Sequence, residues 1–396
     1  MFSILRIFLA AIAGVTLLTL TVYVASNKVP MSETLIFSSQ APAPTIESSS
    51  SPIVVSNVAA GFTPPETTTS TPKKPRIRKS TSSQKNASTK TTTTTSTSSN
   101  DITRIQNPYP FAPKTVEEVN ANTRAALVNI LCDTSGSTLQ PISGSGVVID
   151  PRGIILTNAH VGQYVLLSTR PELQLSCLIR TGSPAVPHWR AQMLYIPSIW
   201  VKEHVREITQ SHPQGTGEND YALLFVTGSV DEQTLPQKFP YLPFDTRDAV
   251  GFVGDPILVA GYPAEFVGGI ATRMGLYASS AATAVKEILT FVDRTVDLLS
   301  LGSTVVAQGG SSGGAVANQW GQLIGLVVTT SEGTTTASRD LRAITIAHID
   351  RSLRTNFGTG LKELLAGDPA ALSAQFATEQ GPELSQLLMD RIPKRQ

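Results

Sequence analysis

Gly310-Ser311-Ser312-Gly313-Gly314 carries the strongest signal in this sequence, together with Thr157-Asn158-Ala159-His160-Val161 far upstream. A serine hydroxyl is a poor nucleophile until a neighbouring base takes its proton. Glycines beside the serine leave backbone N–H groups uncovered, so that these groups can point at the oxyanion formed during acyl transfer. The two stretches therefore predict one active site, with Ser312 as the nucleophile and His160 as the base.

The third member of this site should be a carboxylate that fixes the histidine tautomer, and Asp220 is the best candidate. It lies just before the apolar run Tyr221 to Val226. A loop would enter a buried strand there, which suits a carboxylate that is desolvated but hydrogen-bonded. A turn acid or a strand-terminal cap is the alternative interpretation of Asp220. The predicted chain order is His160, Asp220, Ser312.

These motifs resemble the trypsin-like serine peptidases, and in detail the HtrA (Deg) branch. The resemblance runs roughly from Ala126 to Phe357, and its segments follow in family order at 144–149, 153–161, 220–224, 254–263 and 310–316. It implies that His160 is the general base, Asp220 its orienting acid and Ser312 the nucleophile. It also implies an oxyanion hole made by the N–H groups of Gly310 and Ser312. Ala315 stands where the family usually has proline.

The fold expected from the pattern alone is all-β, because short apolar segments are separated by Gly and Pro. The predicted strands are 126–132, 146–149, 153–156, 164–168, 221–225, 256–260, 315–317, 323–328 and 342–346. A capping box at Thr115–Glu118 predicts a short helix, and 199–209 has a helical pattern. The resemblance makes the architecture two six-stranded antiparallel β-barrels with short flanking helices. His160 and Asp220 would come from the first barrel and Ser312 from the second.

The specificity pocket can be placed only by resemblance, which implies that Val306, Ala307, Val328 and Thr329 wall it. None of these residues is charged, so the expected polypeptide substrates have a small or medium apolar residue before the scissile bond. Ser311 occupies the position where zymogen-type peptidases have an acid, so activation by a new N-terminal ammonium is not expected.

No cofactor is expected. His188, His204 and His212 match no recognised metal-ligand spacing.

Two other functions compete with this interpretation. Residues 310–314 also fit the G-x-S-x-G elbow of α/β-hydrolases, and Asp340 and His348 follow in the required order. However, these two are close neighbours in the chain, and the segment after Ser312 has the pattern of two strands joined by a glycine turn rather than a helix. The second alternative is a catalytically silent pseudopeptidase that binds peptides or envelope components in the same cleft.

The N-terminal part predicts the location of the protein. Residues 1–6 form a cytoplasmic n-region, and 7–25 form an uncharged, mostly apolar run that is long enough, at about 1.5 Å per residue, for a transmembrane signal anchor. A cleaved signal peptide is the alternative. Residues 26–107 are rich in Ser, Thr and Pro and should form a disordered stalk. The peptidase domain at 108–358 would then lie outside the cytoplasm, in the periplasm or at the cell surface.

The remaining features concern partners and covalent links. The net charge of +1 gives no reason to expect a nucleic-acid partner. Cys132 and Cys177 are a candidate disulfide in an extracytoplasmic domain, with two buried thiols as the alternative. Residues 359–396 are too few for the PDZ domain usual in HtrA proteins, and their leucines predict two amphipathic helices divided by Pro369 and Pro382. The HtrA resemblance also points to a homotrimer.

Overall fold

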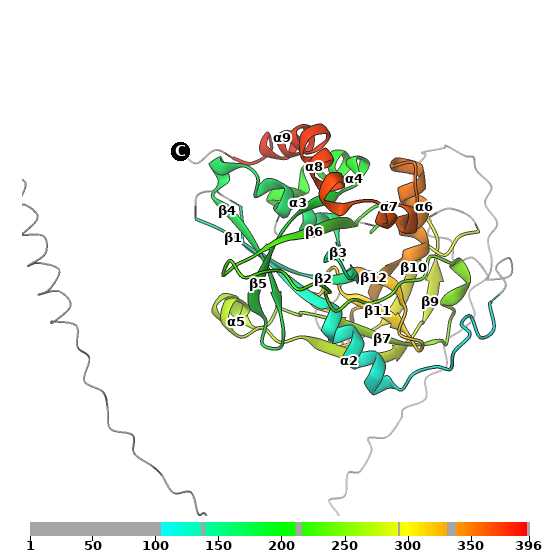
Figure 1. The fold of residues 1–396 in the computed structure, drawn as a ribbon. Helices are drawn as coiled ribbons and strands as arrows, with labels where there is room; N and C mark the ends of the chain where they lie inside the picture. Colours follow the sequence, from blue (N-terminus) through cyan, green and yellow to red (C-terminus); the bar gives the residue numbers. More distant parts are fainter. Residues whose placement is uncertain (1–103, 136–138, 211–215, 292–293, 331–337, 394–396) are drawn as a thin grey trace, which may run out of the picture. The chain divides into compact units, whose positions relative to one another are not determined.

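A closed six-stranded barrel forms the first half of the domain in the computed structural model, which describes residues 104–135, 139–210, 216–291, 294–330 and 338–393. Its strands are β1 (Leu127–Thr134), β2 (Ile142–Asp150), β3 (Ile154–Thr157), β4 (Leu175–Thr181), β5 (Val186–Tyr195) and β6 (Ala222–Ser229). They are antiparallel and close in the order β1-β2-β3-β6-β5-β4 (Figure 1). Every residue of β3 is buried. This strand therefore lies in the barrel core and ends three residues before the predicted base, His160.

The second half is a seven-stranded antiparallel sheet in the order β8-β7-β11-β12-β13-β10-β9. Its strands are β7 (Pro256–Gly261), β8 (Ser279–Ala284), β9 (Glu287–Leu289), β10 (Leu298–Gly302), β11 (Ala315–Asn318), β12 (Leu323–Thr330) and β13 (Leu341–Thr345). One apolar core runs through both halves and joins residues of the first barrel, such as Leu156, to Ala260 and Leu326 of the second sheet. The predicted all-β, double-barrel class is confirmed, with the second unit a curled sheet of seven strands.

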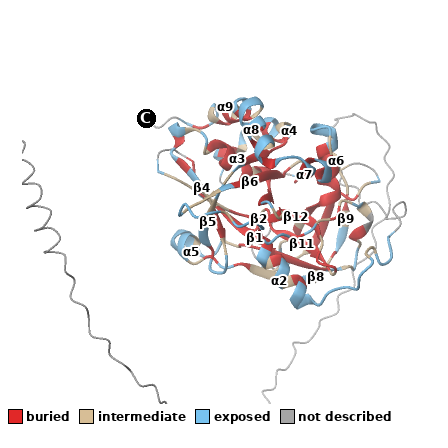
Figure 2. Cartoon of the chain, in the orientation of Figure 1, coloured by how far each residue is buried: buried red, intermediate tan, exposed pale blue. Residues whose placement is uncertain are grey.

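Short helices flank these two units, and Figure 2 shows the buried strands at the centre with exposed faces outside. The predicted helix after Thr115 is α2 (Val116–Ala126), with both hydrogen bonds of its capping box present. The helical pattern at 199–209 forms α4 (Ser198–His204) and the 3₁₀ turn η2 (Glu207–Thr209). Further short helices are η1 (Pro171–Leu173), η3 (Asp248–Val250), α5 (Gly268–Met274) and α6 (Ile346–Asn356).

The predicted strand at 164–168 is wrong, because residues 159–167 form the helix α3 (Ala159–Leu167). Eight of its nine residues are buried, and the predicted part of it, Tyr164 to Leu167, is a continuous apolar run. Such a run shows neither a period of 2 nor one of 3.6, and periodicity cannot separate a short buried helix from a strand. The correction matters for the site, since His160 is the second residue of this helix rather than the end of a strand.

The C-terminal segment forms three helices, where two were predicted: α7 (Leu361–Ala366), α8 (Pro369–Glu379) and α9 (Gly381–Met389). Pro369 and Pro382 lie in the first turns of α8 and α9, where a missing N–H costs nothing. Both helices pack on the first barrel, α8 on β5 and α9 on α3. Arg170 ties α9 down by donating to Ser385 Oγ at 2.7 Å and to the Pro382 carbonyl at 2.9 Å.

Cys132 and Cys177 form a disulfide between the paired strands β1 and β4. None of the helices in the described part of the chain has the length and apolar character that a membrane crossing requires. The predicted anchor at 7–25 and nearly all of the predicted stalk at 26–107 lie outside the described residues.

Candidate active site

His160 and Asp220 form a close pair at the first barrel. Asp220 Oδ2 lies 2.8 Å from His160 Nδ1, and Oδ1 accepts the backbone N–H of His160 at 3.0 Å. The aspartate is held in turn by Asn158, whose Nδ2 donates to the Asp220 carbonyl at 2.8 Å. A carboxylate accepting at Nδ1 fixes the tautomer with the proton on that nitrogen, which leaves Nε2 free to take a proton. The Asp220 side chain is 7% exposed and that of His160 is 26% exposed, so only the base faces solvent.

The charge of this pair changes the basicity of the ring. Burial opposes a charged imidazole, but the negative charge of Asp220 and its hydrogen bond outweigh that effect, so the pKa of His160 is raised above its usual value. The carboxylate of Glu207 in η2 raises the His160 pKa further. The site therefore stabilises the imidazolium that would form when the ring accepts a proton.

The loop of Ser312 is docked against the strands that lead to His160. The Ser312 carbonyl accepts the N–H of Ser145 at 2.7 Å, and the Ser145 carbonyl accepts the Thr157 hydroxyl at 2.7 Å. Thr157 ends β3, three residues before His160. The structure therefore brings the nucleophile loop to the entrance of α3. The Ser312 hydroxyl is partly exposed and makes no hydrogen bond with any described residue, as is common for catalytic groups before substrate binds.

The amides of this loop alternate in a way that suits an oxyanion hole. Four of them have acceptors: the N–H groups of Gly309, Ser311, Gly313 and Gly314. Those of Gly310 and Ser312 donate to no described atom. Gly310 adopts φ 93°, and a Cβ there would come within 2.6 Å of the Tyr262 carbonyl oxygen, so only glycine fits. The two predicted oxyanion donors are thus the two amides that the fold leaves without acceptors.

Ser145 supports the same loop. The sequence analysis included it only in the segment 144–149 and predicted no role for it. Its hydroxyl donates to the Gly310 carbonyl at 2.8 Å and accepts the Tyr262 N–H at 2.8 Å, and the residue is fully buried. A hydroxyl between two glycines, just before the apolar run Val147 to Ile149, was the available signal. Ser145 links the first barrel to the nucleophile loop.

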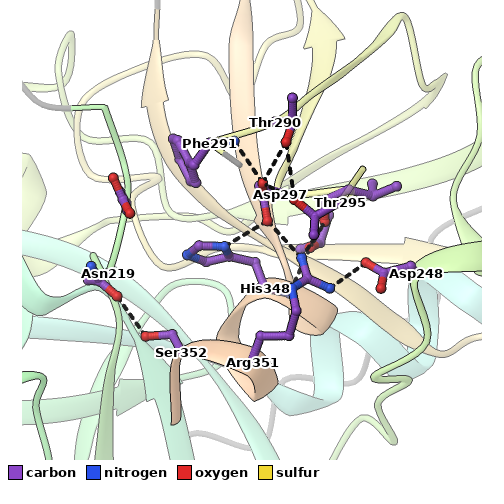
Figure 3. A network of polar contacts seen from close by, with 12 residues as sticks. Asn219, Asp248, Thr290, Phe291, Thr295, Asp297, His348, Arg351 and Ser352 are labelled. Atoms are coloured by element: carbon purple, nitrogen blue, oxygen red, sulfur yellow. Dashed lines mark hydrogen bonds and ion pairs between the residues drawn. The ribbon is translucent and has the colours of Figure 1, made fainter. Parts of the chain in front are cut away.

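A polar network joins the two neighbours of Asp220 in the chain to α6, and Figure 3 shows its contact between Asn219 and Ser352. Asn219 precedes the acid with φ 58°, and its side-chain carbonyl accepts the Ser352 hydroxyl at 2.6 Å. The Tyr221 hydroxyl lies 2.9 Å from the same Ser352 Oγ. Ser352 of α6 thus contacts the residue before Asp220 and the residue after it.

The other end of this network fixes α6 itself. His348 Nδ1 lies 2.9 Å from Asp297 Oδ1, and Arg351 donates to the same oxygen at 2.7 Å. Burial opposes ionisation of Asp297, but hydrogen bonds led by that from His348 hold its pKa well below the usual range. The α/β-hydrolase alternative paired His348 with Asp340, whose carboxylate instead binds Ser300 Oγ at 2.6 Å. That constellation is not assembled.

The predicted pocket residues lie on β12, which holds Val328 and Thr329, and in the segment between β10 and β11, which holds Val306 and Ala307. Val306 and Ala307 are fully buried and Val328 is 3% exposed, while the side chain of Thr329 lies outside the described residues. The histidines weighed as metal ligands are apart: His188 binds Thr181, and His204 stacks on Trp200. His212 lies outside the described residues, and within the rest no cluster of three His, Cys, Asp or Glu could hold a metal ion.

One family of known proteins matches the part of the chain that holds this site. Residues 144–326 match the family described as trypsin-like peptidase domain. The match includes His160, Asp220 and Ser312. The solved structure titled "Crystal structure of Deg5" is similar at 18% identity, over 62% of this chain and 99% of that chain, with a TM-score of 0.40. A search of curated proteins finds no match.

Proposed function

Because the chain carries a trypsin-like peptidase domain at residues 144–326, we propose that it is a serine endopeptidase that hydrolyses peptide bonds through an acyl-enzyme. One observation supports the proposal: the loop of Ser312, with two amides that have no acceptor among the described residues, is hydrogen-bonded through Ser145 to the strand that leads to the His160–Asp220 pair. Nucleophile, base and oxyanion donors are the parts that acyl transfer needs.

The proposed reaction follows from these positions. Nε2 of His160 takes the proton of Ser312 while Oγ attacks the scissile carbonyl, and the resulting oxyanion accepts the N–H groups of Gly310 and Ser312. Asp220 stabilises the imidazolium without taking a proton. The imidazolium then protonates the leaving amine, and water hydrolyses the acyl-enzyme by the same route.

The decisive test is covalent labelling of the full chain by a fluorophosphonate. The wild type should label at a single serine, whereas Ser312→Ala and His160→Ala should not label, because one lacks the nucleophile and the other its base. A folded wild type that never labels would instead be the pseudopeptidase.

The pH dependence should report the raised pKa of His160. The ring acts as base only when neutral, so kcat/KM should rise with pH, and the midpoint of this acid limb should lie above the ordinary histidine value of about 6.5. A rate profile on a peptide substrate from pH 5 to 9 measures it. A midpoint below about 6 would contradict the stabilised imidazolium.

The proposed substrate preference rests on the apolar residues Val306, Ala307 and Val328 near the nucleophile loop. Without a charge among them, small or medium apolar residues should be preferred before the scissile bond. A peptide library profiled by cleavage-site sequencing tests this, and a profile dominated by Arg or Lys would overturn it.

We also propose that the protease is tethered to a membrane by residues 7–25 and acts outside the cytoplasm. The support is the apolar run itself, together with the Ser/Thr/Pro-rich stalk that follows it. The full chain should stay in the membrane pellet after a carbonate wash, and a variant without residues 1–25 should not. A soluble full chain would refute the anchor.

A homotrimer remains the oligomer expected from the HtrA resemblance, and light scattering of the anchorless variant measures it.

A further inference from the structure

An ion pair outside the predicted triad is hydrogen-bonded to the loop of Ser312. Glu265 follows β7 and Arg339 precedes β13. Arg339 Nη2 lies 2.8 Å from Glu265 Oε1, and Nη1 lies 2.5 Å from Oε2. The two planar groups therefore meet through both oxygens, a geometry that fixes orientation as well as distance. The Arg339 side chain is 16% exposed and that of Glu265 is 31% exposed.

This pair reaches the loop at Gly309. Glu265 Oε2 accepts the Gly309 N–H at 3.0 Å, and the Gly309 carbonyl accepts the N–H of Ala264 at 2.7 Å. Residues 264 and 265 thus hold both polar groups of Gly309. Arg339 also approaches the Ala307 carbonyl at 3.5 Å, so it lies along the same loop.

The orientation of the next amide follows from peptide geometry. The carbonyl of Gly309 and the N–H of Gly310 belong to one planar trans peptide and point in opposite directions. Holding that carbonyl against Ala264 therefore aims the Gly310 N–H away from Ala264, and that N–H is one of the two amides without an acceptor.

Two consecutive glycines make this peptide easy to rotate, since neither has a side chain that resists the change. The side chain before the nucleophile does not restrain this peptide: Ser311 is 1% exposed, and its hydroxyl has no partner in the described structure. The restraint must come from neighbouring loops, and Glu265 is the only charged side chain that the described structure bonds to Gly309 or Gly310.

We propose that Glu265 and Arg339 are positioning residues, which keep the Gly309–Gly310 peptide turned so that the Gly310 N–H binds the oxyanion. The inference rests on the proposed peptidase function. Glu265 fixes the orientation of this peptide by accepting the Gly309 N–H, and Arg339 fixes the orientation of the Glu265 carboxylate.

The test compares Glu265→Ala with Glu265→Gln in the full chain. Glu265→Ala removes the acceptor of the Gly309 N–H, so kcat should fall about 10- to 100-fold while KM changes less than about twofold, because the lost contact acts on the transition state. Affinity for a peptide boronate, which mimics the tetrahedral state, should fall in parallel. Glu265→Gln keeps one acceptor and should lose less. The exchanged pair, Glu265→Arg with Arg339→Glu, should not recover kcat, since arginine has no acceptor for Gly309.

A matched control separates this role from ordinary stability. Arg354 and Glu363 form another surface ion pair, 3.1 Å apart, and Glu363→Ala should leave kcat and boronate affinity unchanged. The melting temperature of Glu363→Ala should stay close to the wild type, because exposed pairs stabilise little, and that of Glu265→Gln should stay close to that of Glu265→Ala. If the wild type labels with fluorophosphonate and cleaves peptide but Glu265→Ala keeps full kcat, the positioning role is wrong. If the wild type itself does not label, the proposed function fails instead.

Discussion

Asp220→Asn should lower kcat by about 10³- to 10⁴-fold while the protein stays folded. In the wild type Asp220 accepts two hydrogen bonds, from the His160 backbone N–H and from the ring Nδ1–H. Asparagine can keep only one oxygen, and the backbone N–H needs it. The amide NH₂ then faces Nδ1, which must become an acceptor, so the proton moves to Nε2. A ring protonated at Nε2 cannot take the proton of Ser312.

The same variant should also shift the pH profile. The Asp220 charge is the main influence that raises the His160 pKa against burial, so its removal should move the acid limb of the residual activity to lower pH. Asp297→Asn is the matched control, because Asp297 binds His348 in a similar pair behind the site. It should lower the melting temperature and leave the acid limb where it is. An unshifted limb in Asp220→Asn would contradict the electrostatic role.

Gly313→Ala should abolish labelling of Ser312, or prevent folding of the loop that carries it. A Cβ at this position would lie 2.0 Å from the Ser145 carbonyl oxygen and 2.6 Å from Thr157 Oγ1. Both contacts are far inside van der Waals range, and the backbone at φ 85° already disfavours a side chain. The loop would have to leave the strands that lead to His160, so we expect a loss of at least about 10³-fold in labelling rate, since about 1 Å of displacement already costs about 10²-fold.

Gly254→Ala separates the two causes. Gly254 has a similar φ of 89°, but nothing lies within 4 Å of a Cβ built there. It should show only the strain of the left-handed backbone, about 1 to 2 kcal/mol of stability, with normal labelling. If Gly313→Ala were as stable and as reactive as Gly254→Ala, the close packing of the nucleophile loop on β2 and β3 would be refuted.

The all-β class could be predicted because short apolar segments are separated by Gly and Pro, and the double-barrel arrangement followed from the family resemblance. The candidate site residues could be proposed because acyl transfer demands fixed residue types in short local motifs. His160 and Ser312 stand in such motifs, and Asp220 stands at the mouth of an apolar run. The strand β8, Ser279–Ala284, was missed because its residues are small and only partly buried, so no alternation marks it. The helix α3 was mistaken for a strand because its predicted part, Tyr164 to Leu167, is a continuous apolar run.

The contacts that orient the site could not be predicted, because they join residues far apart in the chain. Glu265 meets Arg339 across the second sheet, and Ser145 reaches Gly310 from the first barrel. A sequence does not distinguish a charged loop residue that faces solvent from one that forms an ion pair or hydrogen bond with another segment. Only the folded arrangement distinguishes these cases.

The packing of α9 on α3 has a practical consequence for any shortened form of the protein. Leu384 and Leu388 share an apolar cluster with Val161 and Val165, which follow His160 in the same helix. A fragment that ends at Phe357 would lack α9 and would expose to solvent the apolar face of α3 that these leucines cover. We therefore expect a shortened form that keeps α9 to be more stable than one that ends at Phe357, and we expect a change in α9 to disturb the helix that carries His160.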